Sequence, residues 1–254
     1  MSTAPSSRRE RQRQATLDEI VQASRSLLGE PGGLTLRAVA QKVGMTAPAL
    51  YRYVDDYKAL VRLIARDIDR ETAALIRAAR DSQPEDDPVA RIICSAVAFR
   101  RWALENKPEF ALVFANPLST AEDHAEVMTE EETGPVFSEM VWQLWLRYRF
   151  PLPPIDSLDP LIVETVDDPV FPGKLEGLPE EARTLVWVLI QSWARLYGTV
   201  TLEVFGHCDP RVIDSAALFR SMLAGQAELF GITDELPRLA PLIDAWLAGG
   251  QIGG

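Results

Sequence analysis

Residues 35–54, TLRAVAQKVGMTAPALYRYV, contain two short helical patterns separated by a tight turn. The first helix is predicted to begin after Thr35, a favourable N-cap residue, and to end at Gly44. The second helix is predicted over residues 46–53, where Thr46 is the N-cap residue. Two short helices joined by such a turn form a helix-turn-helix, which defines the fold of this part of the chain.

Side-chain spacing decides which face of the second helix points inward. Leu50 and Val54 lie one turn apart and are predicted to pack on Leu36, Val39 and Val43 of the first helix. A helix this short presents most of its other side chains to its surroundings, and these are Thr46, Ala47, Ala49, Tyr51, Arg52 and Tyr53. Small residues let the backbone approach base edges, and hydroxyls and a guanidinium can hold phosphates. Each tyrosine alone also fits a half-buried packing residue, but the combined pattern favours DNA contact.

Charge is distributed unevenly along the 254 residues. Residues 1–66 contain 11 Lys and Arg against 6 Asp and Glu, whereas residues 67–254 contain 15 against 31. A basic N-terminal part on an acidic body is typical of a protein that binds a polyanion at one end and stays soluble through the other. The same distribution also fits a basic leader on an acidic enzyme.

The segment LTLRAVAQKVGMTAPALYRYVDDYKALVRLI, residues 34–64, resembles the DNA-binding segment of the TetR family of bacterial transcriptional regulators, and the similarity extends over residues 15–66. The resemblance implies a homodimer whose paired recognition helices enter successive major grooves, about 34–36 Å apart, on a pseudo-palindromic operator. The residues at positions where the family contacts DNA are Thr35, Arg37, Thr46, Ala47, Pro48, Ala49, Tyr51, Arg52 and Tyr53.

Two details of this resemblance bear on how DNA would be read. Tyr57 stands where the family usually has a phosphate-binding lysine, and Lys58 follows it, so both residues are candidates for that contact. Alanine offers no hydrogen bond to a base and can at most contact a thymine methyl group. Arg37 and Arg52 are therefore the expected readers of guanine.

Helical spacing of apolar residues continues along almost the whole chain, so we predict an all-α protein without strands. Besides the helix-turn-helix, helices are expected over residues 16–28, 56–80, 88–106, 108–115, 135–149, 181–206, 211–230 and 234–248. The connections 116–134 and 150–180 receive no assignment. The expected organisation is a flexible basic arm (1–14), a three-helix DNA-binding domain (15–66) and a larger helical domain (67–254) for effector binding and dimerisation.

The expected arm is basic and has no apolar residue from position 6 to position 14. Its arginines are Arg8, Arg9, Arg11 and Arg13. A segment of this kind can lie along phosphates, enter a minor groove or remain a solvated tail. The sequence does not decide between these possibilities.

Two further stretches, FRRWALENKPEFALVFANPL (99–118) and WARLYGTVTLEVFGH (193–207), resemble the C-terminal domain of a TetR subgroup common in actinobacteria and named for a Trp, His and Gly pattern. The histidine of that pattern is missing here, where Leu196 and Tyr197 precede Gly198. This resemblance implies a fold and dimerisation, but no particular effector.

The helix expected at 181–206 is apolar on all sides in its middle part, which predicts burial against a symmetry mate on one side and along a cavity on the other. We hypothesise that an apolar or aromatic effector binds between this helix and helices 88–106 and 135–149. The candidate lining residues are Trp102, Phe110, Phe114, Trp142, Trp145, Trp193 and Tyr197. Each of them alone also fits a core residue of a helical bundle. Ligand binding would move the two DNA-binding heads through helix 56–80, expected to be the only covalent link to the body.

Other classes of protein have less support in the sequence. A secretory signal and a membrane-length apolar run are both missing, and Cys94 and Cys208 do not form a disulfide framework, so a cytoplasmic protein is expected. The histidines, His124 and His207, belong to no catalytic or metal-binding pattern, so we expect no enzyme activity, cofactor or metal. The alternatives that stay open are a helical enzyme and a protein-interaction module that keeps the helix-turn-helix as a scaffold.

Overall fold

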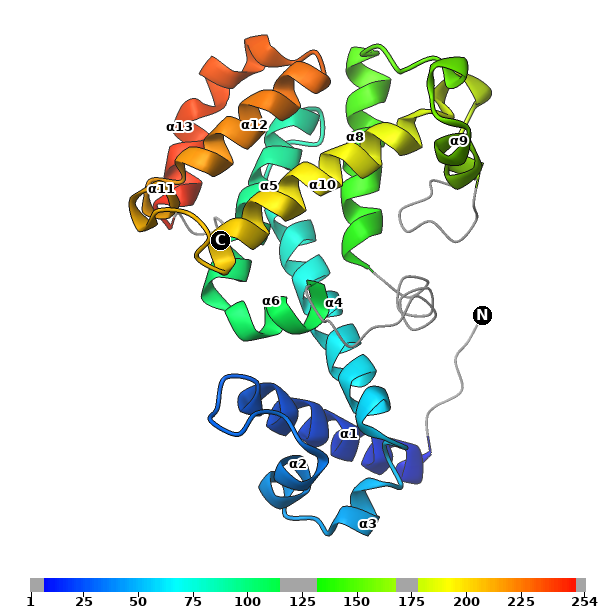
Figure 1. Ribbon diagram of the computed structural model, residues 1–254, viewed down its shortest axis with the longest axis vertical. Helices are drawn as coiled ribbons and strands as arrows, with labels where there is room; N and C mark the ends of the chain where they lie inside the picture. Colours follow the sequence, from blue (N-terminus) through cyan, green and yellow to red (C-terminus); the bar gives the residue numbers. More distant parts are fainter. Residues whose placement is uncertain (1–6, 115–131, 168–177, 250–254) are drawn as a thin grey trace. The chain divides into compact units, whose positions relative to one another are not determined.

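The structure, a computed structural model, describes residues 7–114, 132–167 and 178–249 (Figure 1). Every regular element in these three ranges is a helix, which confirms the all-α prediction. Within the same ranges, no helix is long and apolar enough to cross a lipid bilayer.

The described residues divide into two compact units. The head unit comprises residues 7–68 and 108–114, and the body unit comprises residues 69–107, 132–167 and 178–249. α4 (Tyr57–Asp81) is one continuous helix that belongs to both units. α6 (Lys107–Phe114) belongs to the head unit except for its first residue, so its expected place in the larger domain is wrong.

The head unit contains α1 (Arg8–Leu27), α2 (Leu36–Val43) and α3 (Ala47–Leu50), together with α6 and the first half of α4. The predicted ends of α2 are confirmed. Thr35 Oγ1 accepts a hydrogen bond from the Ala38 amide at 3.1 Å, and Gly44 ends the helix with a φ of 74°. Because glycine adopts this left-handed conformation without a steric penalty, the chain turns directly from α2 into α3.

The centre of the head unit is apolar. Seven of its apolar side chains are at most 1% exposed, namely Ile20, Val39, Leu50, Leu60, Ile64, Ile68 and Phe110. Val54 is 3% exposed, so the inward orientation predicted for Leu50 and Val54 is confirmed. Leu36 and Val43 are only half-buried, so α2 contributes to this core mainly through Val39 and Ala40.

α1 begins at Arg8, so the expected flexible arm is wrong for residues 8–14, and residues 1–6 lie outside the described ranges. Ser7 and Glu10 form a capping box, in which Ser7 Oγ accepts from the Glu10 amide at 3.2 Å and the Glu10 carboxylate accepts from the Ser7 amide. The hydrogen bond from the Ser7 amide holds the pKa of the Glu10 carboxyl below its ordinary value. The start of this helix is indicated in the sequence by a serine three residues before a glutamate. The spacing of apolar residues does not indicate it, because residues 8–14 contain none.

The body unit is arranged around α5 (Pro88–Glu105) (Figure 1). This helix packs against α8 (Thr133–Tyr148), α10 (Leu185–Val204) and α13 (Leu236–Leu247). α12 (Ala217–Leu229) packs against α10 and against α11 (Pro210–Asp214). The remaining elements are α9 (Pro160–Asp167) and the short 3-10 helices Ile155–Ser157, Glu180–Ala182 and Thr233–Glu235.

Some predicted element boundaries in the body unit differ from the structure. The helix expected at 211–230 is divided into α11 and α12 at Ala216, which has a φ of 53°. The described part of the proline-rich stretch 150–180 contains a 3-10 helix and α9, because the prolines in this part lie at or before the helix starts. Residues 168–177 of that stretch lie outside the described ranges, as does most of the connection 116–134.

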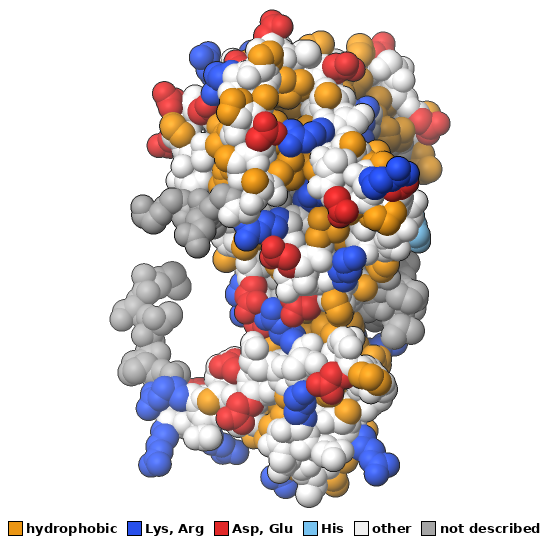
Figure 2. Space-filling model, turned by 90° about the vertical axis from the view of Figure 1, so that its left-hand side faces the viewer, with side chains coloured by type: hydrophobic (Ala, Val, Ile, Leu, Met, Phe, Trp, Pro, Cys, Tyr) orange, Lys and Arg blue, Asp and Glu red, His pale blue; other side chains and the backbone are white. Residues whose placement is uncertain are grey.

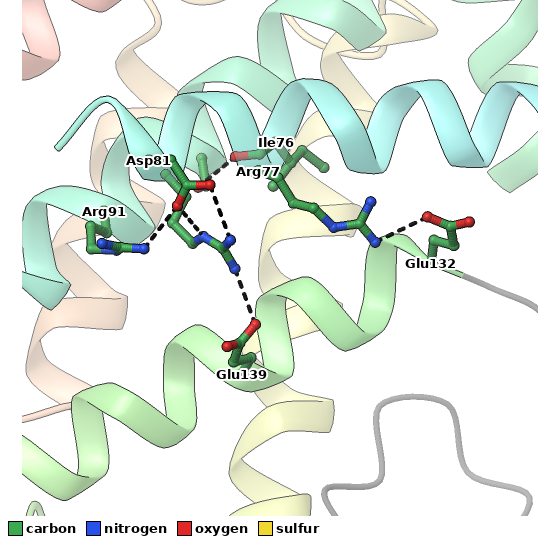
Figure 3. A network of polar contacts seen from close by, with 8 residues as sticks. Ile76, Arg77, Asp81, Arg91, Glu132 and Glu139 are labelled. Atoms are coloured by element: carbon green, nitrogen blue, oxygen red, sulfur yellow. Dashed lines mark hydrogen bonds and ion pairs between the residues drawn. The ribbon is translucent and has the colours of Figure 1, made fainter. Parts of the chain in front are cut away.

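Ion pairs attach the second half of α4 to α5 and α8 inside the body unit (Figure 3). They are Arg77–Glu132 and Arg80–Glu139, each at 3.0 Å, and Arg91–Asp81 at 2.9 Å. Directly before α8, the Glu132 amide donates a hydrogen bond of 2.6 Å to the buried Asp69 carboxylate. This half of α4 is therefore an integral part of the body unit.

Candidate nucleic-acid interface

The outer surface of the helix-turn-helix consists of polar and small side chains. The exposed ones among the predicted DNA-binding residues are Thr35, Arg37, Thr46, Ala47, Pro48, Tyr51, Arg52 and Lys58, whereas Ala49, Tyr53 and Tyr57 are partly covered. Tyr51 is 51% exposed, which is high for a large aromatic side chain. Most of these residues are thus accessible to a partner molecule, and their contact with DNA stays a prediction.

α3 is a single helical turn over Ala47–Leu50, shorter than the predicted 46–53. A hydrogen-bonded turn follows, in which the Tyr53 amide donates to the Leu50 carbonyl oxygen at 2.9 Å. Thr46 precedes α3 in an extended conformation and makes no side-chain capping bond, so the helix does not use its hydroxyl. This distinguishes Thr46 from Thr35, and it favours Thr46 as a hydrogen-bonding partner of DNA.

Backbone hydrogen bonds fix the turn between α2 and α3. The Met45 amide donates to the Ala40 carbonyl oxygen at 2.8 Å, and the Gly44 amide donates to the Gln41 carbonyl oxygen at 3.2 Å. Both bonds satisfy carbonyl groups at the end of α2 in the manner of a Schellman motif. The orientation of α3 against α2 is therefore set without a partner molecule.

Arg13 connects α1 to the residues that follow α3. Its Nη1 donates to the Arg52 carbonyl oxygen at 3.2 Å, and its Cζ lies 5.4 Å from the centroid of the Tyr53 ring. A guanidinium over an aromatic ring is an attractive cation–π contact. This contact partly covers Tyr53, which was expected to be presented outward, and no local sequence pattern indicates it.

Positively charged side chains border this surface, and Figure 2 shows Lys and Arg side chains at the lower end of the head unit. The exposed ones are Arg8, Arg9, Arg11, Arg13, Arg37, Arg52 and Lys58. Asp55 and Asp56 are exposed as well, but Asp56 Oδ1 accepts a hydrogen bond of 2.6 Å from the Ala59 amide and thereby caps α4. A surface of this composition attracts a phosphate backbone.

The aromatic residues predicted to line an effector site belong to both units. Phe110 and Phe114 lie on α6, in the head unit, with ring centroids 5.2 Å apart. Trp142 and Trp145 stack on each other on α8 at 5.4 Å. These four residues form two ring contacts, and their place in a shared effector site stays a prediction.

Trp102, Trp193 and Tyr197 come together around Phe99 of α5 and Phe137 of α8, and we call these five residues the aromatic cluster. The Trp193 ring centroid lies 5.7 Å from Phe99, 5.8 Å from Phe137 and 6.1 Å from Tyr197. Trp102 lies 6.2 Å from Phe99. Sequence reasoning missed Phe99 and Phe137, although Phe99 precedes Trp102 by three residues and so shares its face of α5.

A charged pair buried in the body unit was not predicted either. Arg100 Nε lies 2.6 Å from Glu203 Oε2, and Arg100 Nη2 donates to the Ile213 carbonyl oxygen at 2.7 Å. Burial raises the pKa of the Glu203 carboxyl, while the Arg100 guanidinium opposes that effect. The pair joins α5 to α10 and to α11, which makes it a structural element of the body unit.

The part of the chain that the structure describes contains no group of three or more His, Cys, Asp and Glu side chains suited to a metal ion. His207 is exposed shortly after α10, and His124 lies outside the described ranges.

A helix-turn-helix with an exposed basic surface, carried by a chain with a second and larger helical unit, defines a two-part DNA-binding regulator. The sequence profile of the family described as tetracyclin repressor-like, C-terminal domain, matches residues 92–225, more than half of the chain. The protein therefore belongs to the TetR family, and the resemblance seen in its helix-turn-helix is confirmed. Its narrower resemblance to the subgroup with the Trp, His and Gly pattern stays a prediction.

Relatives with known names are regulators of transcription. The chain is 28% identical over 209 residues to the HTH-type transcriptional regulator Rv1816 of Mycobacterium tuberculosis and to Mb1846 of Mycobacterium bovis, covering 78% of this chain and 87% of each relative. It is also similar to the crystal structure of SCO4313, which is described as a regulatory protein, with a TM-score of 0.62 and 25% identity over 88% of this chain and 98% of that one.

Proposed function

We propose that the protein is a ligand-responsive transcriptional repressor that binds a palindromic operator as a homodimer. The observation that carries DNA binding is the exposed outer surface of α2 and α3, which is held in shape by its own hydrogen bonds and bordered by arginines. Repression is the usual mode of action in the TetR family and is the direction proposed here. A regulator of this kind acts on chromosomal DNA in the cytoplasm.

Two kinds of DNA contact are proposed within this surface. Arg37 and Arg52 would read guanine, because a guanidinium can bind N7 and O6 of one guanine together. Thr46, Tyr51 and Lys58 would hold phosphates and so fix the position of the protein on the duplex. The small residues of α3, which are Ala47, Pro48 and Ala49, would let the backbone come close to the base edges.

An exposed stripe along α10 supports the homodimer. Ala194, Leu202 and Phe205 are exposed, the last two by 41% and 42%. Gly198 lies between them, and a Cβ added there would meet no heavy atom within 4 Å. These residues recur every three or four positions and so share one face of the helix. In a twofold-symmetric dimer, α10 would pack through this face against its own copy.

The aromatic cluster is the proposed effector site, because three helices bring rings together there and Trp102, Trp193 and Tyr197 are half-exposed. An apolar or aromatic ligand that prefers one arrangement of these helices would shift the equilibrium between DNA-binding and non-binding forms. The chain passes between the units through α4 and also at residues 107–108, after α5. The expectation that helix 56–80 is the only covalent link is therefore wrong, and within the described residues the signal can pass through α4 and through residues 107–108.

Selection of bound sequences from random duplex DNA, at a stated salt concentration, tests the proposed function. Enrichment of an inverted repeat is expected, because two copies of the surface related by a twofold axis read two half-sites. Enrichment of a single half-site would contradict the homodimer. Absence of any enrichment from folded protein would contradict DNA binding itself.

Tryptophan fluorescence tests the effector site with a panel of apolar aromatic compounds. A compound that binds the aromatic cluster should quench the emission and should release the selected DNA. Trp193→Phe keeps an aromatic ring while it removes the reporter nearest to the centre of the cluster, so its quenching should be smaller. Quenching that is unchanged in Trp193→Phe would place the compound elsewhere.

A further inference from the structure

The basic beginning of α1 lies beside the helix-turn-helix surface but is not part of it. Residues 8–14 are helical, and Arg8, Arg9 and Arg11 are exposed. The capping box formed by Ser7 and Glu10 provides hydrogen-bond acceptors for two backbone amides at the start of α1, so this segment is an ordered helix end. Its arginines therefore have defined directions relative to the rest of the head unit.

Arg13 fastens this segment to the end of the recognition element. Its guanidinium donates to the Arg52 carbonyl oxygen and lies over the Tyr53 ring, so the face of α1 that carries Arg13 meets the turn after α3. Arg9 precedes Arg13 by four residues, which places it on the same face about 6 Å further along the helix axis. The surface that begins at α3 thus continues along α1 through Arg9.

We propose that the first two turns of α1 form a second DNA-contacting surface, whose arginines bind phosphates beside those reached from α3, with Arg13 as a positioning residue. The proposal rests on the DNA-binding function proposed above. An α-helix is about 10–12 Å in diameter and does not fit a minor groove about 6 Å wide. The helix therefore excludes insertion of residues 8–14 as an extended arm, whereas guanidinium groups on its surface are well suited to phosphate oxygens.

The double variant Arg8→Gln/Arg9→Gln tests the phosphate contacts. Glutamine and arginine have similar helix propensities, so the variant should keep the circular dichroism spectrum of the unaltered protein. Binding is measured on the selected DNA sequence, extended by one helical turn on each side, over a series of salt concentrations. The logarithm of the affinity should fall less steeply with the logarithm of salt, by about 0.9 for each phosphate that the variant no longer binds. The selected base sequence should not change.

A matched control separates phosphate contact from general charge. Arg101→Gln/Arg147→Gln removes the same number of positive charges from exposed positions of the body unit. Its salt dependence should equal that of the unaltered protein. The proposal is overturned if the two double variants have the same salt dependence. If the unaltered protein selects no DNA sequence, the proposed function is wrong, and this inference is wrong with it. If the unaltered protein binds DNA but the salt dependence of Arg8→Gln/Arg9→Gln is unchanged, only this inference is wrong.

Arg13→Gln tests the positioning role separately. Because the variant loosens the turn that carries Arg52, it should discriminate less well between the selected repeat and a repeat with one base pair changed. If Arg13 only stabilises the fold, Arg13→Gln should have a lower unfolding midpoint but should discriminate between the two repeats as well as the unaltered protein. That outcome would overturn the positioning role of Arg13. Arg13→Lys keeps the cation over Tyr53 and should restore part of the discrimination.

Discussion

The Arg25 guanidinium joins α1 to α6 in the head unit, because its Nε lies 2.8 Å from Oε1 of Glu109. Its Nη1 also lies 3.0 Å from Oδ2 of Asp67 on α4. The Arg25, Glu109 and Asp67 side chains are 14%, 16% and 25% exposed, so water screens these pairs only in part. Three helices of the head unit are thus held together by one arginine, and one of them, α6, follows directly after the chain leaves the body unit.

Replacement of Arg25 should therefore destabilise the head unit. Arg25→Met leaves two partly buried carboxylates without this partner, and we expect a loss of about 2 kcal/mol in the free energy of unfolding, measured with urea. Arg25→Met/Glu109→Gln should recover part of the loss, since one of those charges is removed. Lys42→Met breaks the exposed Lys42–Glu30 pair and should cost less than about 1 kcal/mol. Equal losses from Arg25→Met and Lys42→Met would contradict the role of Arg25.

Arg37 and Lys58 should affect DNA binding in different ways. Arg37→Ala should cost about 1–3 kcal/mol on the selected operator and relax the preference at one base position, because the variant cannot hydrogen-bond to the base. Lys58→Ala should weaken binding to all sequences alike and reduce the salt slope by about 1, because one phosphate is no longer neutralised. Fluorescence anisotropy titrations at several salt concentrations measure both effects. If Tyr57→Phe rather than Lys58→Ala changes the affinity, the phosphate contact belongs to Tyr57.

Features of the head unit that depend on neighbouring residues could be predicted from the sequence, whereas contacts between distant residues could not. Thr35 and Gly44 act on their own neighbours in the chain, so the limits of α2 could be predicted. Glu109 lies 84 residues after Arg25, and a pairing across that separation leaves no periodic trace in one sequence. The place of α6 in the head unit could not be predicted for that reason. The same reason applies to the contact of Arg13 with Arg52, 39 residues apart.

The body unit shows a similar division between local and distant causes. Asp87 was not singled out, although its Oδ1 caps α5 by accepting from the Ala90 amide at 3.0 Å. Its Oδ2 lies 2.6 Å from Nη1 of Arg238, which holds α13 against the start of α5. The capping role can be predicted from the sequence, because an aspartate directly precedes a proline at the start of a helix. The pairing with Arg238 depends on the tertiary fold and cannot be predicted in this way.

Asp87 makes the stability of the body unit depend on pH. The hydrogen bond from Arg238 is the main reason why the pKa of the Asp87 carboxyl lies below its ordinary value of 3.8. Because the folded state has the lower pKa, this contribution to stability is present above pH 3.8 and is lost as the pH falls through the lowered pKa. Asp87→Asn keeps a capping oxygen and removes the titration. The difference in unfolding midpoint between the two proteins should therefore shrink on acidification, and a constant difference would contradict this role.

Gly198 permits a test of the proposed dimer in which two substitutions have opposite effects. Glycine within a helix costs about 1 kcal/mol relative to alanine, and a Cβ at Gly198 meets no heavy atom within 4 Å, so Gly198→Ala should stabilise the protomer. Gly198→Arg also fits the isolated protomer, because the position is open, but a long charged side chain would prevent a second α10 from packing there. Sedimentation over a dilution series should then show Gly198→Arg dissociating at a higher concentration than the unaltered protein, with equal helix content. If Gly198→Arg stays as dimeric as Gly198→Ala, the copies must associate through another face, because two closely packed α10 helices leave no room for an arginine side chain between them.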